Sequence, residues 1–385
     1  MRFSVDAHAV GQHLTGNETY IRNLLANFAL LDEDAEFVAY VSHPQAATLV
    51  PGRFATRSVS RNPFVRLGAS LSARAGEDKP DLIHVQYTAP LFCPVPVVAT
   101  VHDVSFLSNP EYFTRFRSAQ LRYTVRRTVK SAARILTPSE FSRRGIIDAY
   151  GLDEDRVVAI PNAVSSAFHP MSRTKAARWV GSNFGFHFPF MLTVGDLQPR
   201  KNHLGLIRAF EEAVRAQPQL PHHLLMVGQD TWYSPAIHEA ARKSLVADRI
   251  HFTGFVNDDD LLRLYGACDL FVFPSFYEGF GLPILEAMAC GRAVACSNTS
   301  AIPEVADSAA LLFDPASRHE MVRAIIDLLL DSELRARMER LGSQHAAQFS
   351  WSRTARKTLD VYYEVANASR RVSVRAAAAS AVRSR

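Results

Sequence analysis

The sequence predicts an α/β protein of two Rossmann-like domains, each built on a parallel sheet, and three observations support this prediction. The chain has 385 residues, which is enough for about two domains of ordinary size. Short apolar runs alternate with stretches of helical spacing along the whole chain, a pattern typical of parallel strands covered by helices on both faces. The runs form two series, and each series matches the size of one doubly wound domain.

The first series predicts an N-terminal domain over residues 1–165. Its six apolar or β-branched runs are the expected strands, at 3–5, 37–41, 82–85, 97–101, 135–137 and 157–160. The stretches between them are long enough for the crossover helices that parallel strands require. A polar stretch after residue 165 marks the end of this domain.

The second series predicts a C-terminal domain over residues 180–350. Its strands are expected at 191–194, 224–227, 250–252, 270–273, 293–295 and 311–313. The boundary between the domains should fall within residues 163–188. In open α/β sheets, ligands bind at the carboxyl ends of the strands. Two sheets that face each other would therefore place the active site in the cleft between the domains.

The C-terminal end of the chain divides into two parts. Residues 351–368 have helical spacing, with Trp351, Ala355 and Leu359 on one face. From Ser369 onward the sequence is rich in arginine, alanine and serine. Residues 369–385 are therefore expected to form a mobile tail.

Composition and cysteine usage indicate a globular protein of the cytoplasm. Of the residues, 48% are hydrophobic and 21% are charged, which is ordinary for a folded domain. No apolar run approaches the roughly 20 residues of a membrane-spanning helix, and the first residues lack the apolar core of a signal peptide. The four cysteines form no Cys-x-x-Cys pair and predict buried, reduced thiols. No cluster of metal-ligating residues is visible in the sequence.

A basic segment at residues 112–134 predicts a surface contact. No acidic residue lies between Glu111 and Glu140, and aromatic residues are interleaved with the cations, which are Arg115, Arg117, Arg122, Arg126, Arg127, Lys130 and Arg134. A basic helix of this kind can lie on an anionic membrane, peripherally on the inner face of the plasma membrane. The alternative is an ordinary solvated helix face. Nucleic acid is not an expected partner, because no recognition motif accompanies the charge.

The most specific signal is the segment from Glu278 to Glu286, which directly follows the predicted strand at 270–273. Its glycines let the backbone approach a ligand closely. The N–H groups of Gly281 and Leu282, at the start of the helix that Pro283 predicts, suit an anionic diphosphate. Two carboxylates at this spacing can bind hydroxyls at different depths of one ligand. Either glutamate alone would more often be a surface charge.

This segment, Glu-Gly-Phe-Gly-Leu-Pro followed by Glu-Ala-Met-Ala-Cys-Gly, resembles family 4 of the retaining glycosyltransferases. The resemblance implies the GT-B fold, with two Rossmann-like domains whose sheets face each other across a deep cleft. It implies that Glu278 contacts the donor hexose and Glu286 the ribose hydroxyls. Backbone contacts from Gly279, Phe280 and Gly281 are implied as well. The likeness extends over residues 1–366, with the helix at 351–368 crossing back to the N-terminal domain.

Two further segments of the C-terminal half fit the same resemblance. Gly195 follows the strand at 191–194, and Arg200 and Lys201 come shortly after it. Cations at a strand-to-helix turn can neutralise a pyrophosphate, and in the family this basic pair clamps the donor diphosphate. Phe255 and Val256 resemble the family segment that lies near the nucleotide base, although the end of a core strand is an equal alternative.

The N-terminal half carries weaker signals. Gly16 lies in a glycine-containing loop that, by the resemblance, faces the donor phosphate and the acceptor, with a helix expected from Tyr20. His102 directly follows the run at 97–101 and resembles the cleft histidine of the family, which contacts the donor sugar. A His-Asp pair alone is weak evidence, and the motifs of the C-terminal half strengthen it.

The resemblance implies transfer of a hexose from a nucleotide sugar to an acceptor hydroxyl, with retention of configuration. The motifs are similar to those of bacterial mannosyltransferases of surface-polysaccharide assembly, so we expect GDP-mannose as donor and a glycan or polyprenol-linked acceptor. We expect no cofactor and no metal ion, because no Asp-x-Asp motif lies in a suitable loop. Three alternatives remain open: a nucleotide-sugar epimerase of the same fold, a transferase like glycogen or sucrose synthase, and a non-catalytic donor-binding subunit.

Overall fold

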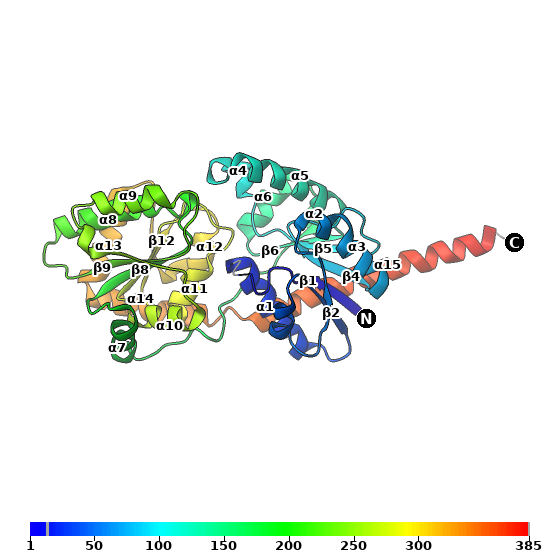
Figure 1. The fold of residues 1–385 in the computed structure, drawn as a ribbon, viewed down its shortest axis with the longest axis horizontal. Coiled ribbons are helices and arrows are strands. Elements are labelled where there is room, and N and C mark those ends of the chain that lie inside the picture. The colour runs from blue at the N-terminus through cyan, green and yellow to red at the C-terminus, as the bar shows by residue number, and fades with distance from the viewer. Residues whose placement is uncertain (13–14, 384–385) are drawn as a thin grey trace. The chain divides into compact units, whose positions relative to one another are not determined.

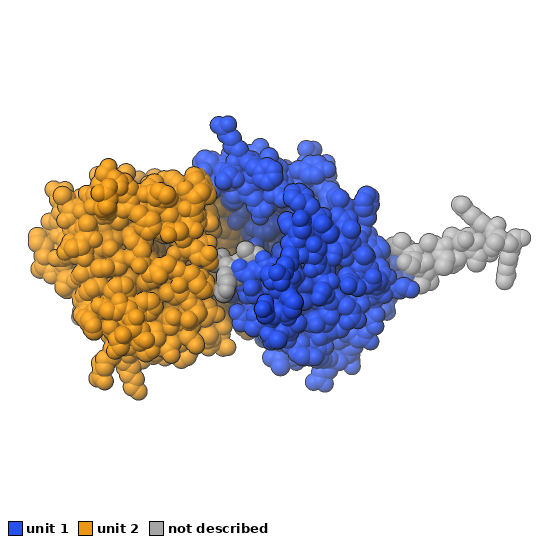
Figure 2. Space-filling view, in the orientation of Figure 1, with its two compact units in different colours: residues 1–162, 351–385 blue, residues 163–350 orange. Residues whose placement is uncertain are grey.

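The chain forms two compact units, each with its own parallel sheet (Figures 1 and 2). The structure is a computed structural model that describes residues 1–12 and 15–383, except for the side chains of Thr15 and residues 372–383. Unit 1 comprises Met1–Asn162 together with Trp351–Arg385, and unit 2 comprises Ala163–Ser350. The chain therefore passes from unit 1 to unit 2 and back.

Unit 1 is built on a seven-stranded parallel sheet with the strand order β3-β2-β1-β4-β5-β6-β7. The strands are β1 (Arg2–Asp6), β2 (Glu36–Val41), β3 (Ala55–Ser58), β4 (Leu82–Gln86), β5 (Val97–Thr100), β6 (Arg134–Thr137) and β7 (Val157–Ala159). All six predicted strands are present, and β3 is an additional one. Strand β3 was not predicted because its sequence, Ala-Thr-Arg-Ser, has no apolar run, and as an edge strand it buries none of its four residues.

Helices cover this sheet in the crossovers between its strands. They are α1 (Thr15–Leu31), η1 (Pro44–Leu49), α2 (Pro63–Val65), η2 (Arg66–Ser70), α3 (Leu71–Asp78), α4 (Ser105–Ser108), η3 (Pro110–Tyr112), α5 (Arg115–Ser131), α6 (Glu140–Tyr150) and η4 (Glu154–Arg156). Side-chain caps start α2, α5 and α6, because Asn62 accepts from the Phe64 N–H, Thr114 from the Arg117 N–H and Ser139 from the Ser142 N–H. Such caps satisfy N–H groups that the helix itself leaves unpaired.

The C-terminal helix α15 (Trp351–Arg383) belongs to unit 1 and packs against α1. Its buried face includes Trp351, Ala355 and Leu359. The phenol of Tyr362 lies 2.5 Å from Nδ1 of His84 in β4, which ties the helix to the middle of the sheet. The helix is longer than the predicted 351–368. The sequence predicts a mobile tail at residues 369–385. The side chains beyond Arg371 lie outside the described part of the chain, so this stays a prediction.

Unit 2 is built on a six-stranded parallel sheet with the order β10-β9-β8-β11-β12-β13. The strands are β8 (Phe190–Val194), β9 (His223–Val227), β10 (Ile250–Gly254), β11 (Leu270–Phe273), β12 (Val294–Ser297) and β13 (Leu311–Phe313). They match the six predicted strands. The helices are α7 (Arg173–Phe184), η5 (Pro199–Lys201), α8 (His203–Ala216), α9 (Ser234–Lys243), η6 (Ala247–Arg249), α10 (Asp258–Ala267), α11 (Leu282–Ala289), α12 (Ile302–Ala306), η7 (Asp307–Ala309), α13 (Arg318–Leu330) and α14 (Ser332–Ala346).

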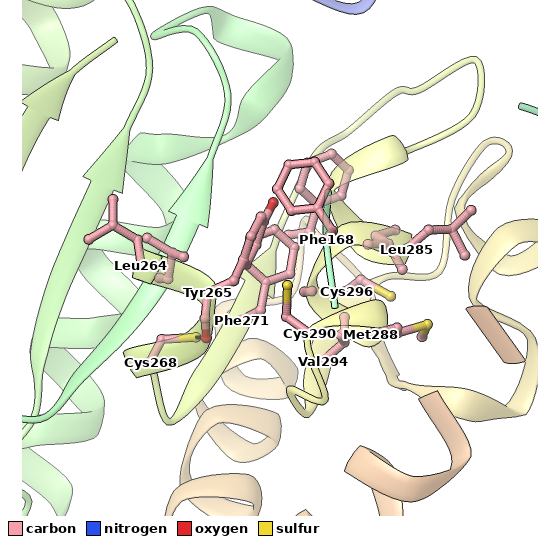
Figure 3. Close-up of a cluster of buried hydrophobic side chains, with 14 of the residues drawn as sticks. Phe168, Leu264, Tyr265, Cys268, Phe271, Leu285, Met288, Cys290, Val294 and Cys296 are labelled. Carbon is pink, nitrogen blue, oxygen red and sulfur yellow. Dashed lines mark hydrogen bonds between the residues drawn. The ribbon is translucent and has the colours of Figure 1, made fainter. Parts of the chain in front are cut away.

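Two apolar clusters bury the two faces of this second sheet. One contains residues of α7, α10, α11 and α12, and the other contains residues of α8, α9 and α13. Figure 3 shows part of the first cluster, with Tyr265 beside Phe271 and the thiols of Cys268, Cys290 and Cys296 among the apolar side chains. All four cysteines of the chain are free; these three are buried, as the sequence predicted, whereas Cys93 is only half-buried and departs from that prediction. Helix α7, which begins before the predicted start of the domain at residue 180, packs on α10 in this cluster.

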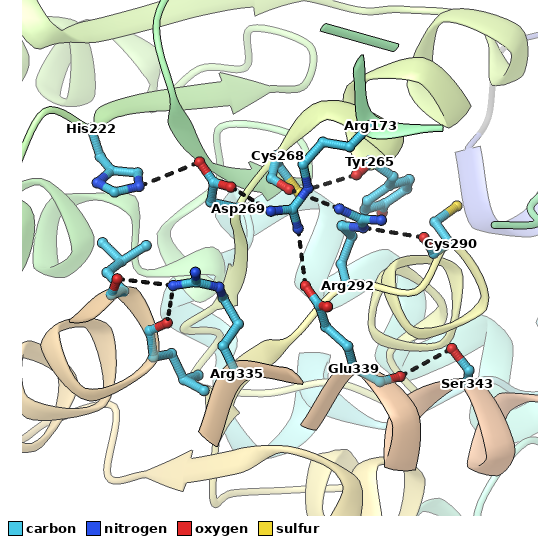
Figure 4. Close-up of polar contacts among 12 residues, drawn as sticks. Arg173, His222, Tyr265, Cys268, Asp269, Cys290, Arg292, Arg335, Glu339 and Ser343 are labelled. Atoms are coloured by element: carbon cyan, nitrogen blue, oxygen red, sulfur yellow. Dashed lines mark hydrogen bonds and ion pairs between the residues drawn. The ribbon is translucent and has the colours of Figure 1, made fainter. Parts of the chain in front are cut away.

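A polar network ties α7 and α14 to the start of β11 (Figure 4). Arg173 pairs with Asp269 at 2.8 Å and with Glu339 at 3.0 Å, and His222 lies 3.3 Å from Asp269. Asp269 directly precedes β11, so this network lies at the amino end of the strand. Ligands of parallel sheets bind at the opposite, carboxyl end, so we assign the network a structural role.

Candidate functional site

The carboxyl ends of β8 and β11 bring the two main motifs of unit 2 together. The two strands are neighbours in the sheet, so the loops that follow them leave the same edge side by side. The Phe276 N–H donates to the Arg200 carbonyl at 2.8 Å, which joins the loop after β11 to the one after β8. Residues that are about 77 positions apart in the sequence therefore share one site.

Three charged side chains form the centre of this site. Arg200 donates from Nη1 to Oε2 of Glu278 at 2.7 Å, and Lys201 donates from Nζ to Oε1 at 2.6 Å. Glu278 and Lys201 are only 7% and 8% exposed. The Lys201 ammonium also lies 4.7 Å from the centre of the Phe273 ring. Each carboxylate oxygen of Glu278 thus holds one cation, in an environment where charge pairs are screened little by water.

The charges of this cluster shift one another's protonation equilibria. Burial alone would raise the pKa of Glu278, but Arg200 and Lys201 outweigh it and lower the pKa to about 2. Burial lowers the pKa of Lys201 from its ordinary value, and the attraction of Glu278 opposes this effect. The ion pairs therefore keep Glu278 negatively charged and work to keep Lys201 positively charged.

The backbone around the cluster explains the two glycines that the sequence singled out. Gly195 has a φ of 150°, and a Cβ atom there would lie 3.0 Å from Cε of Lys201, so glycine makes room for the lysine stem. Gly281 has a φ of 111° and immediately precedes α11. No side chain of the described residues caps the start of α11. The first N–H groups of α11 therefore add partial positive charge at the same edge of the sheet.

Glu286 lies on α11, half-buried, one turn and more from the start of the helix. The phenol of Tyr265 in α10 donates to its Oε2 at 3.0 Å. Burial raises the pKa of Glu286 to about 7, and the Tyr265 hydrogen bond moderates the increase. The sequence did not indicate Tyr265, because an aromatic residue on the apolar face of a helix is typical of a core residue.

The remaining predicted residues of unit 2 also lie at this edge. Gly279, Phe280 and Leu282 belong to the loop and first turn around Glu278. Phe255 and Val256 follow β10, which is two strand positions from β8 in the sheet. Ser300, in a left-handed conformation with a φ of 56°, accepts from the Glu278 N–H at 2.9 Å and holds this loop in place. The sequence did not assign this role to Ser300.

His102 and Gly16 lie in unit 1, so the structure does not place them relative to the residues of unit 2. Nε2 of His102 donates to Oε1 of Gln86 at 2.9 Å, which leaves Nδ1 as an acceptor. Burial lowers the pKa of His102 to about 4, so the ring is neutral near pH 7. Gly16 lies in the first turn of α1 and not in a loop before a helix at Tyr20, because α1 already begins at Thr15.

Unit 1 also contains a charged cluster that the sequence did not indicate. Asp6, at the carboxyl end of β1, is buried and accepts from Nη1 of Arg66 at 2.8 Å. Nδ1 of His8 lies 3.1 Å from the same carboxylate oxygen. Burial would raise the pKa of Asp6, but His8 and Arg66 lower it to about 2. Asp6 also accepts from the His8 backbone N–H at 3.3 Å, so His8 lies beside this carboxylate at the edge where the sheet would bind a ligand.

Comparisons with known proteins identify the family. A model of "Glycosyltransferase Family 4" matches residues 15–168, and a model of "Glycosyl transferases group 1" matches residues 184–345. O-antigen chain mannosyltransferase B of Escherichia coli is 34% identical over 273 residues, which are 69% of this chain and 69% of that protein. The chain belongs to glycosyltransferase family 4. This membership confirms the resemblance that the segment from Glu278 to Glu286 indicated.

Other proteins are similar to the chain in sequence or in fold. Serotype-specific mannosyltransferase WbdA of Escherichia coli is 29% identical over 316 residues, which are 76% of this chain but only 38% of that longer protein. The structure of Anabaena Alr3699/HepE in complex with UDP and glucose superimposes with a TM-score of 0.76 at 19% identity, over 94% of this chain and 100% of that chain. The likeness in structure confirms the predicted GT-B fold.

For a glycosyltransferase, the cluster in unit 2 has a clear chemical use. Two cations and an open helix start can stabilise negative charge on a leaving group, and carboxylates can accept hydrogen bonds from hydroxyls of a sugar or ribose. Within residues 1–12 and 15–383, no group of three or more His, Cys, Asp or Glu side chains is arranged to hold a metal ion. In the same part of the chain, no helix is both long and apolar enough to cross a membrane.

Proposed function

We propose that the protein transfers a hexose from a nucleotide sugar to a hydroxyl of a glycan or polyprenol-linked acceptor, with retention of anomeric configuration. The observation that carries this proposal is the ion-paired cluster of Arg200, Lys201 and Glu278. The cluster lies at the carboxyl edge of its sheet, where α/β sheets bind their ligands. It offers positive charge and a hydroxyl acceptor within one small site.

Arg200 and Lys201 bind the donor diphosphate in this proposal, and the start of α11 adds its partial positive charge. Fixed positive groups stabilise the charge that develops on the diphosphate as the bond to the sugar breaks. Because these groups supply the charge that a divalent metal supplies in other enzymes, we propose that transfer needs no metal ion. Glycine at position 195 leaves room for Lys201, because a Cβ atom there would crowd the lysine side chain.

The two glutamates recognise hydroxyls of the donor. Glu278 accepts hydrogen bonds from the hexose and Glu286 from the ribose, with backbone contacts from Gly279 and Phe280. Phe255 and Val256 lie near the base. These assignments agree with the spacing of the two carboxylates, one on the loop before α11 and one on the helix.

Retention follows from attack on the face that the diphosphate leaves. The acceptor oxygen forms a bond to the anomeric carbon, the bond from that carbon to the phosphate oxygen breaks, and the leaving phosphate takes the acceptor proton. Glu278 is a poor candidate for a covalent nucleophile, since both of its oxygens hold cations. His102 is neutral and can accept a hydrogen bond from a hexose hydroxyl through Nδ1.

The names of the relatives support mannose as the sugar and surface polysaccharide as the product. Two of them are mannosyltransferases, and one of these is named for O-antigen chains. We therefore propose GDP-mannose as donor and a growing glycan as acceptor. The acceptor binds unit 1, at the carboxyl edge that carries His102 and the cluster of Asp6, His8 and Arg66.

Helix α5 supports a peripheral membrane contact for a lipid-linked acceptor. Phe116 and Tyr123 are 74% and 70% exposed on one face of the helix, and the exposed Arg115, Arg122 and Arg126 flank them on its solvent side. Arg127 of α5 donates to the Ala89 and Pro90 carbonyls, which places the exposed Phe92 on a loop beside the helix. Aromatic and basic side chains on one face suit an anionic lipid surface.

A ligand screen followed by a transfer assay tests the proposed function. GDP, UDP, ADP and their hexose conjugates are added to the full chain, and the donor that binds the folded state raises its melting temperature. That donor is then incubated with mannose-terminated oligosaccharides in EDTA, and nuclear magnetic resonance reads the anomeric configuration of the product. Product with retained configuration supports the proposal. An epimerised donor without acceptor, or binding without transfer, would support the alternative functions.

A further inference from the structure

Glu278 forms ion pairs with Arg200 and Lys201, the two cations that the proposed function assigns to the donor diphosphate. Nη1 of Arg200 lies 2.7 Å from Oε2 of the carboxylate, and Nζ of Lys201 lies 2.6 Å from Oε1. Both distances are typical of strong charge-assisted hydrogen bonds. A carboxylate with both oxygens engaged resembles, in charge and geometry, an anionic ligand already bound to the pair.

A diphosphate that enters this site competes with Glu278 for the positive charge of Arg200 and Lys201. The three side chains together carry one positive charge, and a nucleoside diphosphate brings two or more negative ones. Near the buried Glu278, repulsion between the carboxylate and the phosphates is weakly screened. Arg200 keeps one bond during such an exchange, since its Nη1 also donates to the Tyr277 carbonyl at 3.1 Å. Among the described residues the Glu278 side chain has no further partner, because the bonds of Glu278 to Ser300 and Ala301 use its backbone N–H and carbonyl.

We propose that Glu278 makes the site discriminate between a sugar nucleotide and the free nucleoside diphosphate. The diphosphate of a sugar nucleotide binds the two cations, and its hexose hydroxyls donate hydrogen bonds to Glu278. A nucleoside diphosphate binds the two cations but has no hexose hydroxyl to donate to Glu278, so the buried carboxylate of Glu278 is left poorly paired. Glu278 therefore weakens binding of the product relative to the donor. This inference rests on the proposed function, which assigns the diphosphate to Arg200 and Lys201.

Such discrimination has a consequence for turnover. A transferase releases its nucleoside diphosphate after each cycle, and release of product is often the slow step of an enzyme. Once the hexose has left for the acceptor, Glu278 loses its hydroxyl partners and competes again for Arg200 and Lys201. The carboxylate thereby assists departure of the product.

Calorimetric titration of the full chain with GDP and with GDP-mannose tests this inference, using the isosteric variant Glu278→Gln. The variant removes the competing charge, so its Kd for GDP should fall by about tenfold, on the scale of one charge pair of about 1.4 kcal/mol. Its Kd for GDP-mannose should fall less or rise, so that the preference for the donor shrinks. An unchanged or higher Kd for GDP would overturn the inference.

Glu286→Gln is the matched control, because Glu286 is a carboxylate of the same site that bonds to Tyr265 and not to the cation pair. This control should weaken GDP binding. If it tightened GDP as much as Glu278→Gln does, any loss of negative charge would explain the effect, and the specific competition would be contradicted.

A second measurement needs no variant and so does not depend on the folding of Glu278→Gln. The Kd of GDP for the wild-type chain is measured with and without saturating free mannose, glucose or galactose, with mannitol as a control for solvent effects. A hexose that restores partners to Glu278 should tighten GDP several-fold. No tightening by any of the three sugars would count against the inference. Failure of every nucleotide and sugar nucleotide to bind would instead overturn the proposed function itself, and the inference with it.

Discussion

The phenol of Tyr265 donates a hydrogen bond to Oε2 of Glu286 at 3.0 Å, from a ring that is fully buried between α10 and the sheet. The Tyr265 hydroxyl thereby fixes the position of one oxygen of the Glu286 carboxylate. In the proposed function Tyr265 is a positioning residue, because its hydroxyl contacts the carboxylate of Glu286 and not the donor.

Tyr265→Phe should weaken nucleotide binding through the ribose. The ring stays packed while the hydrogen bond is lost, so we expect the Kd of GDP to rise by about tenfold, consistent with one hydrogen bond to a charged group. Binding of a 2′,3′-dideoxy analogue of GDP, which offers Glu286 no hydroxyl, should change little. Calorimetry of both ligands measures this difference, and equal losses for the two would mean that the tyrosine acts only on the structure.

Donor binding should strengthen as the pH rises from 6 to 8. Burial raises the pKa of Glu286 to about 7, and the groups that act on this carboxyl are Tyr265, Asp258 and Lys201. Ribose hydroxyls need the deprotonated form as acceptor, so the Kd of the donor should fall by about tenfold over this range. Glu286→Gln should bind weakly with little dependence on pH. A pH dependence that persists in this variant would contradict the assignment.

Acid should remove the stability that the ion pairs of Glu278 contribute. Its pKa in the folded state is lowered to about 2 from an ordinary value of 4.5, so the contribution is complete above pH 4.5 and is lost as the pH falls toward 2. Glu278→Gln should lower the free energy of unfolding by about 3 kcal/mol at pH 7. Urea unfolding at several pH values measures this, with Glu239→Gln as a control of small effect, because the pairs of Glu239 with Arg242 and Lys243 lie at the surface. A difference that stays constant down to pH 2 would contradict the pKa assignment.

Binding to anionic vesicles should depend on the aromatic residues of α5. Replacement of both Phe116 and Tyr123 by serine should lower co-sedimentation with phosphatidylglycerol vesicles by about tenfold, because two exposed apolar rings no longer enter the lipid interface. Added salt should weaken binding of the wild type. Trp232→Ser, an exposed aromatic residue of unit 2, is the control. Equal binding of the double variant and the wild type would exclude this surface.

The sequence predicted the strands of unit 2 well because each of them is a short apolar run between helices. It missed β3 in unit 1, whose polar sequence forms an exposed edge. It also ended the C-terminal helix too early, since the Ala- and Arg-rich stretch after Ala368 continues α15. Alanine and arginine favour helices, which explains the continuation of α15.

The charged centre of the site was only partly predictable. The motifs predicted Arg200, Lys201 and Glu278 as residues of the candidate site. Their mutual ion pairs were not predictable, because these depend on β8 and β11 being neighbours in the sheet. Tyr265 and the pair of Asp6 with Arg66 gave no signal, because contacts between distant elements do not follow from local spacing. For His102 the sequence indicated the residue, and the structure adds the Gln86 bond that fixes its tautomer.

The most direct test of the central claim is the turnover of Lys201→Ala with saturating donor and acceptor. The claim is that Arg200, Lys201 and Glu278 grip the donor diphosphate and hexose, so loss of the buried ammonium should lower kcat by about 100-fold, as removal of one transition-state stabiliser does. The exposed Lys243→Ala serves as control and should keep wild-type turnover. Near-normal kcat for a folded Lys201→Ala variant would contradict the account.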